Sequence, residues 1–153
     1  MSVYSETRTL PYSAEYLFGL VAAVDTYPLF LPWILGSTVY NQSPGQFDAD
    51  LVIGYKFIRH QYTSRVRLFP SDRIEVDHIS GPFRYLKNTW TFAPKSSSDA
   101  PSRTEISVHI DYEFKNIFLQ KALEPVFDHA SRQIIGAFER RALLLNLVGT
   151  DRR

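Results

Sequence analysis

The feature that most constrains the fold is a long amphipathic segment near the end of the 153-residue chain. Between residues 116 and 148, apolar side chains recur at helical spacing across roughly eight turns. They are Leu119, Leu123, Val126, Phe127, Ala130, Ile134, Phe138, Ala142 and Leu145. One helix with so long an apolar face must bury that face against another layer of structure. Because Pro125 removes a backbone hydrogen bond, we expect a kink there or two helical segments that meet there.

A period of two residues, typical of strands, runs through the middle of the chain. It is clearest in TEISVHIDYEF (104–114), where apolar and polar residues alternate strictly. Segments 47–53 and 57–69 alternate in the same way. The predicted inner set of the second segment is Ile58, His60, Tyr62, Ser64, Val66 and Leu68. Turn residues separate the runs at 43–46, 70–73, 80–82 and 94–103, which predicts an antiparallel meander.

Two short helical pieces are predicted between the first strand and this meander. Ser13 can cap a helix over 13–24, where Leu17 and Val21 share one face. The following stretch, VDTYPLFLPW (24–33), reads as one more turn that Asp25 or Thr26 caps and Pro32 ends. Such a turn would hold large apolar side chains in a fixed cluster where the chain enters the next strand.

Composition excludes several classes of function. With 17 Lys and Arg against 16 Asp and Glu, the formal charge is +1, so total charge does not favour nucleic acid as an obligatory partner. The absence of Cys excludes disulfides and thiolate sites. Four His without paired ligand spacing, and seven Gly without a phosphate loop, predict neither a metal site nor a nucleotide site.

The length suits one domain over residues 1–153. No apolar run approaches the roughly 18 residues of a membrane span, and the start of the chain has no targeting pattern. We therefore expect a protein of the bacterial cytoplasm that is peripheral to the inner membrane. If a presequence has been removed, the matrix side of mitochondria is the alternative.

Four segments together resemble the coenzyme Q-binding, polyketide cyclase-like branch of the START superfamily. They are the initial helices, VDTYPLFLPW, GPFRYLKNTWTFAP (81–94) and FDHASRQIIGAFERRA (127–142). The resemblance spans nearly the whole chain. It implies an α+β helix-grip fold, in which a curved antiparallel sheet wraps around a long C-terminal helix and two short helices follow the first strand. It also implies an apolar cavity between the sheet and the helix.

The resemblance implies rival functions. In the favoured one, the protein carries ubiquinone or a polyprenyl-quinone intermediate for respiration or quinone biosynthesis, so the lipid is a bound ligand and no cofactor is needed. The alternatives are a toxin that blocks ribosomal subunit association, and a polyketide cyclase or aromatase with His60 or Tyr62 as acid or base. We favour a binding protein without catalytic or metal residues. Its expected partners are a hydrophobic lipid and, transiently, a membrane, with no DNA; the ribosome is a partner only in the toxin alternative.

A quinone site needs much apolar area and a few hydrogen-bond donors, because the ligand has a long tail and a head group with oxygens. The candidate ligand-binding residues are Phe30, Leu31, Trp33, His60, Tyr62, Phe83, Asn88, Trp90, Leu123, Phe127, Ile134 and Phe138. Each could instead fill the core, because a cavity wall and a core have the same sequence pattern. Phe30, Leu31 and Trp33 could form a lid, a tip that touches a membrane, or a plug at the end of the sheet.

Basic residues alternate along the outer face of one predicted strand, at Arg59, Arg65 and Arg67. Such a run is usually a solvated face. It could also meet anionic lipid head groups, which would help a carrier to dock, or ribosomal RNA, which the toxin alternative requires.

Overall fold

The computed structural model describes residues 2–95 and 102–151, and in this part of the chain one seven-stranded sheet packs against helices. The strands are β1 (Ser2–Leu10), β2 (Ile34–Ser43), β3 (Gln46–Tyr55), β4 (Ile58–Phe69), β5 (Arg73–Ser80), β6 (Phe83–Pro94) and β7 (Thr104–Phe114). All neighbouring pairs are antiparallel, in the order β1-β7-β6-β5-β4-β3-β2. The meander predicted from the turn residues is confirmed, although most of the 94–103 loop lies outside the described residues.

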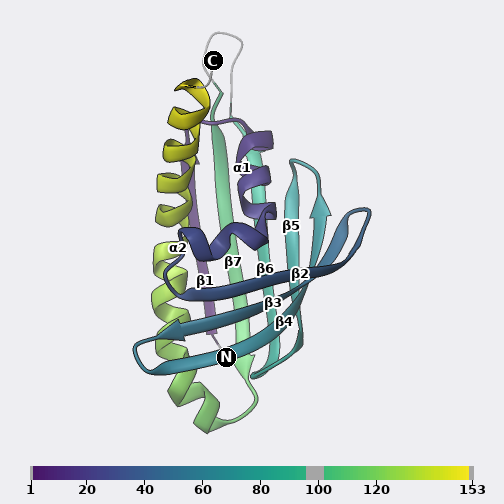
Figure 1. Ribbon diagram of the computed structural model, residues 1–153, viewed down its shortest axis with the longest axis vertical. Helices are drawn as coiled ribbons and strands as arrows, with labels where there is room; N and C mark the ends of the chain where they lie inside the picture. Colours follow the sequence, from purple (N-terminus) through teal and green to yellow (C-terminus); the bar gives the residue numbers. More distant parts are fainter. Residues whose placement is uncertain (1, 96–101, 152–153) are drawn as a thin grey trace.

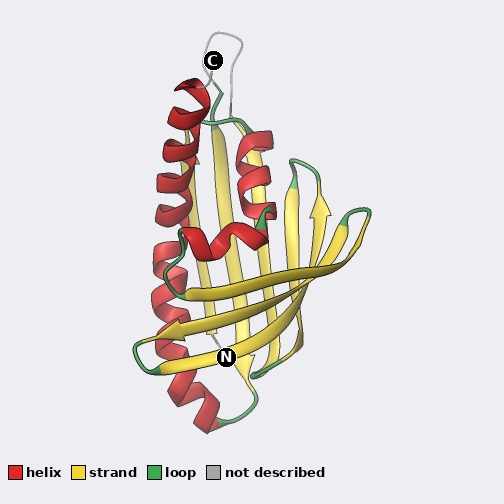
Figure 2. Ribbon diagram, in the orientation of Figure 1, coloured by secondary structure: helices red, strands yellow, loops and turns green. Residues whose placement is uncertain are grey.

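The helices lie on the concave side of this sheet. After β1 come α1 (Ala14–Ala22) and the 3-10 helix η1 (Val24–Leu29), and after β7 comes α2 (Ile117–Asp151). In Figure 1, β2, β3 and β4 cross β1, β7 and β6 at a steep angle, so the sheet curves towards α2. Figure 2 shows α1, η1 and α2 gathered on one side of the strands. This is the helix-grip arrangement that the sequence predicted.

The interior between these layers is apolar and contains many large buried side chains. Ile106 of β7 and Ile135 of α2 are completely buried, and Trp90 and Phe138 are nearly so. Trp90 meets Phe138 with ring centroids 5.3 Å apart in an edge-to-face arrangement, a geometry that aromatic pairs prefer. The sheet and α2 therefore share one hydrophobic core.

Local signals explain where the short helices begin. Ser13 caps α1, since its side-chain oxygen accepts a hydrogen bond from the Tyr16 amide as predicted. The cap predicted at Asp25 or Thr26 is wrong, because η1 begins at Val24 without a side-chain cap. The Thr26 hydroxyl instead donates backwards to the carbonyl of Ala23.

Two further expectations need correction. Of the two alternatives at Pro125, two separate segments are wrong, because α2 is continuous through this residue, whereas a kink there stays a prediction. Ile58 was assigned to the inner face of β4, yet it is exposed, because it lies at the hairpin end of the strand. The predicted inner residues Tyr62, Ser64 and Val66, further along β4, are buried.

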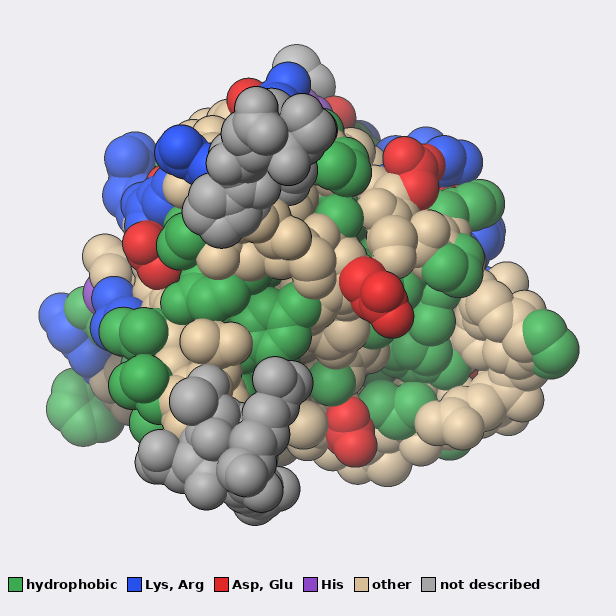
Figure 3. All heavy atoms as spheres, turned by 90° about the horizontal axis from the view of Figure 1, so that it is seen from above, with side chains coloured by type: hydrophobic (Ala, Val, Ile, Leu, Met, Phe, Trp, Pro, Cys, Tyr) green, Lys and Arg blue, Asp and Glu red, His purple; other side chains and the backbone are tan. Residues whose placement is uncertain are grey.

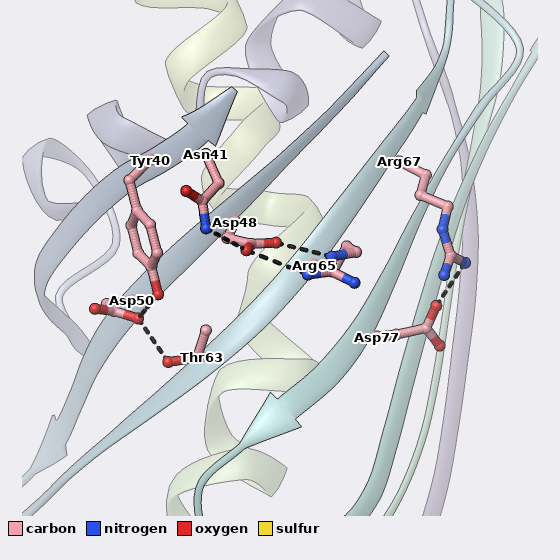
Figure 4. A network of polar contacts seen from close by, with 8 residues as sticks. All are labelled: Tyr40, Asn41, Asp48, Asp50, Thr63, Arg65, Arg67 and Asp77. Carbon is pink, nitrogen blue, oxygen red and sulfur yellow. Dashed lines mark hydrogen bonds and ion pairs between the residues drawn. The ribbon is translucent and has the colours of Figure 1, made fainter. Parts of the chain in front are cut away.

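On the outer face of β3, β4 and β5, charged side chains pair with one another across neighbouring strands (Figure 4). Asp48 accepts hydrogen bonds from Arg65 at 3.0 Å and from Asn41 at 3.1 Å, and these two contacts lower the pKa of its carboxyl. Arg67 pairs with Asp77 at 2.9 Å. Of the three arginines on the outer face of β4, Arg65 and Arg67 are therefore bonded within the sheet, which leaves Arg59.

The basic side chains are also dispersed on the face of the molecule seen in Figure 3. Figure 3, a view from above the end of α2, shows hydrophobic side chains near the middle of the face and Lys and Arg side chains around its rim. Leu143, Leu144 and Leu147, all about half exposed, lie on this last part of α2. The face shown carries no continuous basic surface among the described residues.

Candidate functional site

An internal cavity of about 100 Å³ lies between the concave face of the sheet and α2. Its wall is mostly apolar and includes residues of α1, η1, every strand from β2 to β7, and α2. Small side chains leave this space open: Ala49 on β3 faces it from the sheet, and Ala130 and Ser131 face it from the helix. Most known ligand pockets measure roughly 300–1,000 Å³. A ligand of ordinary size must therefore displace some of the wall.

The hydroxyl of Ser64 in this wall is fully buried and has no protein partner among the described residues. Ser64 is completely buried, lines the cavity, and makes no hydrogen bond through its hydroxyl. A bulge in β5 lies directly beside it, because Thr63 pairs with Ser80 whereas Ser64 pairs with His78. Buried hydroxyls normally have a partner, so Ser64 can donate to or accept from a bound molecule.

Tyr62 lies two residues away on the same face of β4 and also lines the cavity. Burial alone raises the pKa of its phenol well above the ordinary value, so the group keeps its proton at neutral pH. Gly81, with φ of 139°, makes this position possible, because a Cβ there would lie 2.5 Å from the Cβ of Tyr62. The β4 part of the wall therefore offers two neutral hydroxyl groups.

Two other polar groups in the wall, the side chains of Trp90 and Asn88, form a hydrogen bond with each other. The Trp90 indole N–H donates to the Asn88 side-chain oxygen at 3.0 Å, and the Asn88 amide donates to the carbonyl of His109 at 3.1 Å. The indole thus has a partner without any ligand. A hydrogen bond from the indole to a ligand oxygen would have to replace the bond to Asn88.

The structure brings seven of the twelve candidate residues into the cavity wall. They are Leu31, Trp33, Tyr62, Asn88, Trp90, Phe127 and Ile134. They come from the η1–β2 connection, β4, β6 and α2, segments far apart in the sequence. Ligand contact by these seven stays a prediction.

The other five candidates lie outside the wall. Phe30 packs edge-to-face on Phe138, with ring centroids 5.0 Å apart, and Phe138 in turn lies behind Trp90. Phe83 and Leu123 are almost fully buried in the core but do not reach the cavity. His60 lies near the exposed hairpin end of β4, where its Nδ1 is 3.1 Å from the carbonyl oxygen of Gln61.

The burial of residues 30–33 bears on the three alternatives proposed for them, namely a lid, a membrane-touching tip and a plug. Leu31 and Trp33 are buried, so neither forms an exposed tip that could touch a membrane. Leu29, just before them, is the exposed residue of this turn. Phe30 is partly buried and stacks under the guanidinium of Arg141 at 5.0 Å. Leu31 and Trp33 therefore lie in the cavity wall, and the lid and plug alternatives both stay predictions.

Sequence reasoning did not select Ser64 or Ser131 as candidates. Both were visible in the pattern, since Ser64 lies in phase with Tyr62 and Val66, and Ser131 follows Phe127 by one helical turn. A serine on an otherwise apolar face was the available signal.

No cluster of His, Cys, Asp or Glu in the described residues could hold a metal ion. Within the same residues, no helix combines the length and hydropathy needed to cross a bilayer.

Relatives in sequence carry two kinds of name. The ribosome association toxin RatA of Rickettsia prowazekii is 35% identical over 146 residues, which are 93% of this chain and 97% of that protein. The coenzyme Q-binding protein COQ10 homolog B of Xenopus laevis, a mitochondrial protein, is 29% identical over 140 residues. These are 91% of this chain and 57% of that protein.

Solved structures agree on the fold. An 18 kDa protein of Caulobacter crescentus is 34% identical, with a TM-score of 0.73 over 95% of this chain and 99% of that one. The Zhui aromatase/cyclase of Streptomyces has a TM-score of 0.78 over 92% of this chain and 93% of that one, at 16% identity, which shows a shared fold alone. A model of the family described as polyketide cyclase/dehydrase and lipid transport matches residues 10–139. Since this match runs from the end of β1 into α2, the chain belongs to the polyketide cyclase/dehydrase and lipid transport family.

Proposed function

We propose that the protein binds a polyprenyl quinone, or a precursor of one, in the internal cavity and acts as its carrier. The observation that carries this proposal is an apolar cavity whose wall contains the unpartnered hydroxyl of Ser64. An apolar tail would gain roughly 25 cal/mol for each Å² that it buries, and a head-group oxygen could accept a hydrogen bond from Ser64 or Tyr62. The COQ10 relatives, named for coenzyme Q binding, support this class of ligand.

The positions and chemistry of His60 and Tyr62, the two candidates for a catalytic acid or base, favour binding without catalysis. His60 lies outside the cavity wall, and the raised pKa of Tyr62 makes its phenol a donor rather than a general base. We therefore propose a binding protein, although the aromatase/cyclase neighbours show that this fold also occurs in enzymes.

Fluorescence gives a direct test, because the chain has two Trp and both Trp33 and Trp90 line the cavity. Ubiquinone with one isoprene unit, titrated into delipidated protein, should quench this emission to saturation at a stoichiometry near one. Ala130→Leu adds three carbons inside the cavity and should weaken binding at least tenfold. Ala122→Leu makes the same change on the same helix at a partly buried residue outside the wall, and should bind like wild type.

The pair of variants makes the test decisive. Equal affinity in Ala130→Leu and wild type would place the quinone elsewhere on the molecule. An absence of quenching by ubiquinone in folded wild-type protein would contradict the proposed ligand class.

A second function, association with ribosomal subunits, is favoured by a different observation. The relative named as a ribosome association toxin aligns over 97% of its own length, against 57% for the COQ10 relative. Sedimentation through a density gradient tests it: the protein should comigrate with a free subunit and lower the fraction of joined ribosomes. Comigration that persists in Ala130→Leu would separate this function from quinone binding.

A further inference from the structure

The turn between β3 and β4 exposes a large apolar side chain without cover. Phe57 is 99% exposed at its tip, and Ile58 and the nearby Leu35 of β2 are 36% and 45% exposed. Lys56 adopts a positive φ of 58°, which turns the chain sharply at this point. Leu35 fits against Gly54, where a Cβ would lie 2.5 Å from its Cδ1. The hairpin therefore presents a compact apolar tip.

The charged side chains of the hairpin itself, Lys56 and Arg59, are both positive. Lys56 and Arg59 flank Phe57 and Ile58, and neither forms an ion pair with any group in the described part of the chain. No Asp or Glu occurs between residues 51 and 71. Arg65 and Arg67, further along β4, differ because acidic residues of the sheet pair with them. Free cations thus lie only at the hairpin end of this strand.

A surface groove of about 280 Å³ lies beside the hairpin, and one residue of its lining, Trp33, also lines the internal cavity. Hairpin residues such as Tyr55 and Ile58 form one side of the groove, and His129 of α2 forms another. Trp33 lines both the groove and the cavity, so its indole is a wall between them. The His129 ring meets the Trp33 ring edge-on at 6.2 Å and lies 4.9 Å from the Tyr55 ring.

We propose that the hairpin tip docks on an anionic bilayer, with Phe57 and Ile58 in the acyl boundary and Lys56 and Arg59 at the head groups. The groove then faces the membrane, and displacement of the Trp33 indole opens a path between bilayer and cavity. Aromatic residues with flanking cations are typical of interfacial anchors. The docking part of this proposal is argued from the hairpin residues alone, whereas the path past Trp33 rests on the proposed quinone binding.

A bilayer fits this surface better than RNA does. An RNA base would stack on Phe57, but the aliphatic side chains of Ile58 and Leu35 beside it gain more from acyl chains. Each basic residue near an anionic bilayer adds a roughly equal attraction, so Lys56 and Arg59 are enough to strengthen docking. Binding to a nucleic-acid backbone usually needs more phosphate contacts than two cations can make.

Cosedimentation with vesicles tests the docking. Wild-type protein should bind vesicles of equal parts phosphatidylcholine and phosphatidylglycerol more tightly than pure phosphatidylcholine. Phe57→Ser should weaken that binding roughly tenfold, since a buried aromatic side chain is lost. Phe118→Ser is the matched control, because Phe118 is 82% exposed at the start of α2 and should be dispensable. Lys56→Gln with Arg59→Gln should remove most of the preference for anionic vesicles.

Three results would overturn the docking proposal. They are wild-type vesicle binding by Phe57→Ser, loss of binding in Phe118→Ser alone, or a Phe57→Ser defect in ribosome comigration without any defect on vesicles. The last result would assign the tip to RNA.

A quinone titration without vesicles separates this proposal from the proposed function. Phe57→Ser should bind ubiquinone in solution like wild type, yet extract it from vesicles more slowly. If wild type binds vesicles through Phe57 but binds no quinone, the docking surface stands and the proposed ligand fails. If Phe57→Ser extracts quinone from vesicles at the wild-type rate, the path beside the hairpin is wrong.

Discussion

At the scale of single residues, Ser64 is the most informative position in the cavity. Leaving a buried hydroxyl without a partner costs roughly 1–3 kcal/mol, so an alanine would give a more stable empty protein. The strand pairing explains why the hydroxyl is isolated: its neighbours across the sheet are Ala49 on β3 and His78 on β5. In the proposed function, a bound head group supplies the partner that the free protein lacks.

The Ser64→Ala variant tests this reasoning in two independent ways. The empty variant should be about 1 kcal/mol more stable than wild type in urea unfolding, because an unpaired polar group is removed. Its affinity for ubiquinone should fall roughly fivefold to tenfold, whereas affinity for a prenylated benzene without oxygens should not change. A less stable empty variant would mean that the hydroxyl has a partner in the free protein.

His78, beside Ser64, makes stability depend on pH. Burial, and then the charge of Lys115, lowers the pKa of this imidazole below its ordinary value of 6.5, and its Nε2 is buried without a partner. Above pH 6.5 the ring is neutral in both states, so its contribution to stability is complete. As the pH falls below 6.5 the unfolded chain binds the proton first, and the contribution is gone once the pH passes the lower folded-state pKa.

His78→Gln removes this titration. The wild-type free energy of unfolding should decrease more steeply than that of the variant as the pH is lowered from about 7.5 towards 5. Urea unfolding at several pH values measures both slopes. Parallel curves for the two proteins would show that His78 titrates alike in the folded and unfolded chains.

At the scale of elements, the sequence was most informative where the pattern is long. The alternation in β7 and the apolar face of α2 predicted both elements, since burial on one side imposes a period. The sequence was least informative at the ends of strands. The alternation in β4 predicts that Ile58 and His60 point inwards, but at the hairpin end no other layer in the described part of the chain buries them. Which apolar residues line the cavity and which fill the core depends on packing between distant elements. Phe127 and Phe138 therefore look alike in sequence.

Pro125 provides a test of how α2 is held. It lies in the interior of a continuous helix, where it leaves the carbonyl of Lys121 without its usual amide donor, and its side chain is exposed. Pro125→Ala should raise the free energy of unfolding by about 1–3 kcal/mol, measured in urea. Gln133→Ala, at another exposed position of α2, should change it by less than about 0.5 kcal/mol. Destabilisation by Pro125→Ala would mean that the proline shapes the helix to seat its buried neighbours.

At the scale of the whole molecule, the size of the cavity links binding to structural change. About 100 Å³ of space cannot hold a quinone head with even a short tail unless wall residues move. We expect this movement at Trp33, because this residue lines both the cavity and the surface groove. In the proposed function, the empty protein is thus a closed state, and part of the quinone-binding free energy would go into opening it.

Thermal unfolding of the whole protein detects this linkage. A ligand that binds only the folded chain stabilises it by about 2.7 kcal/mol at 100 times its Kd, which for a chain of this size raises Tm by about 5–10 °C. Ala130→Leu fills the same space with its own side chain, so it should have a higher Tm than wild type without ligand and a smaller shift with ubiquinone. This opposite pair of effects distinguishes a ligand inside the cavity from one on the surface, because a surface ligand would shift both proteins equally. A variant with lower Tm and an unchanged shift would mean that Ala130 faces a filled core and that the quinone binds elsewhere.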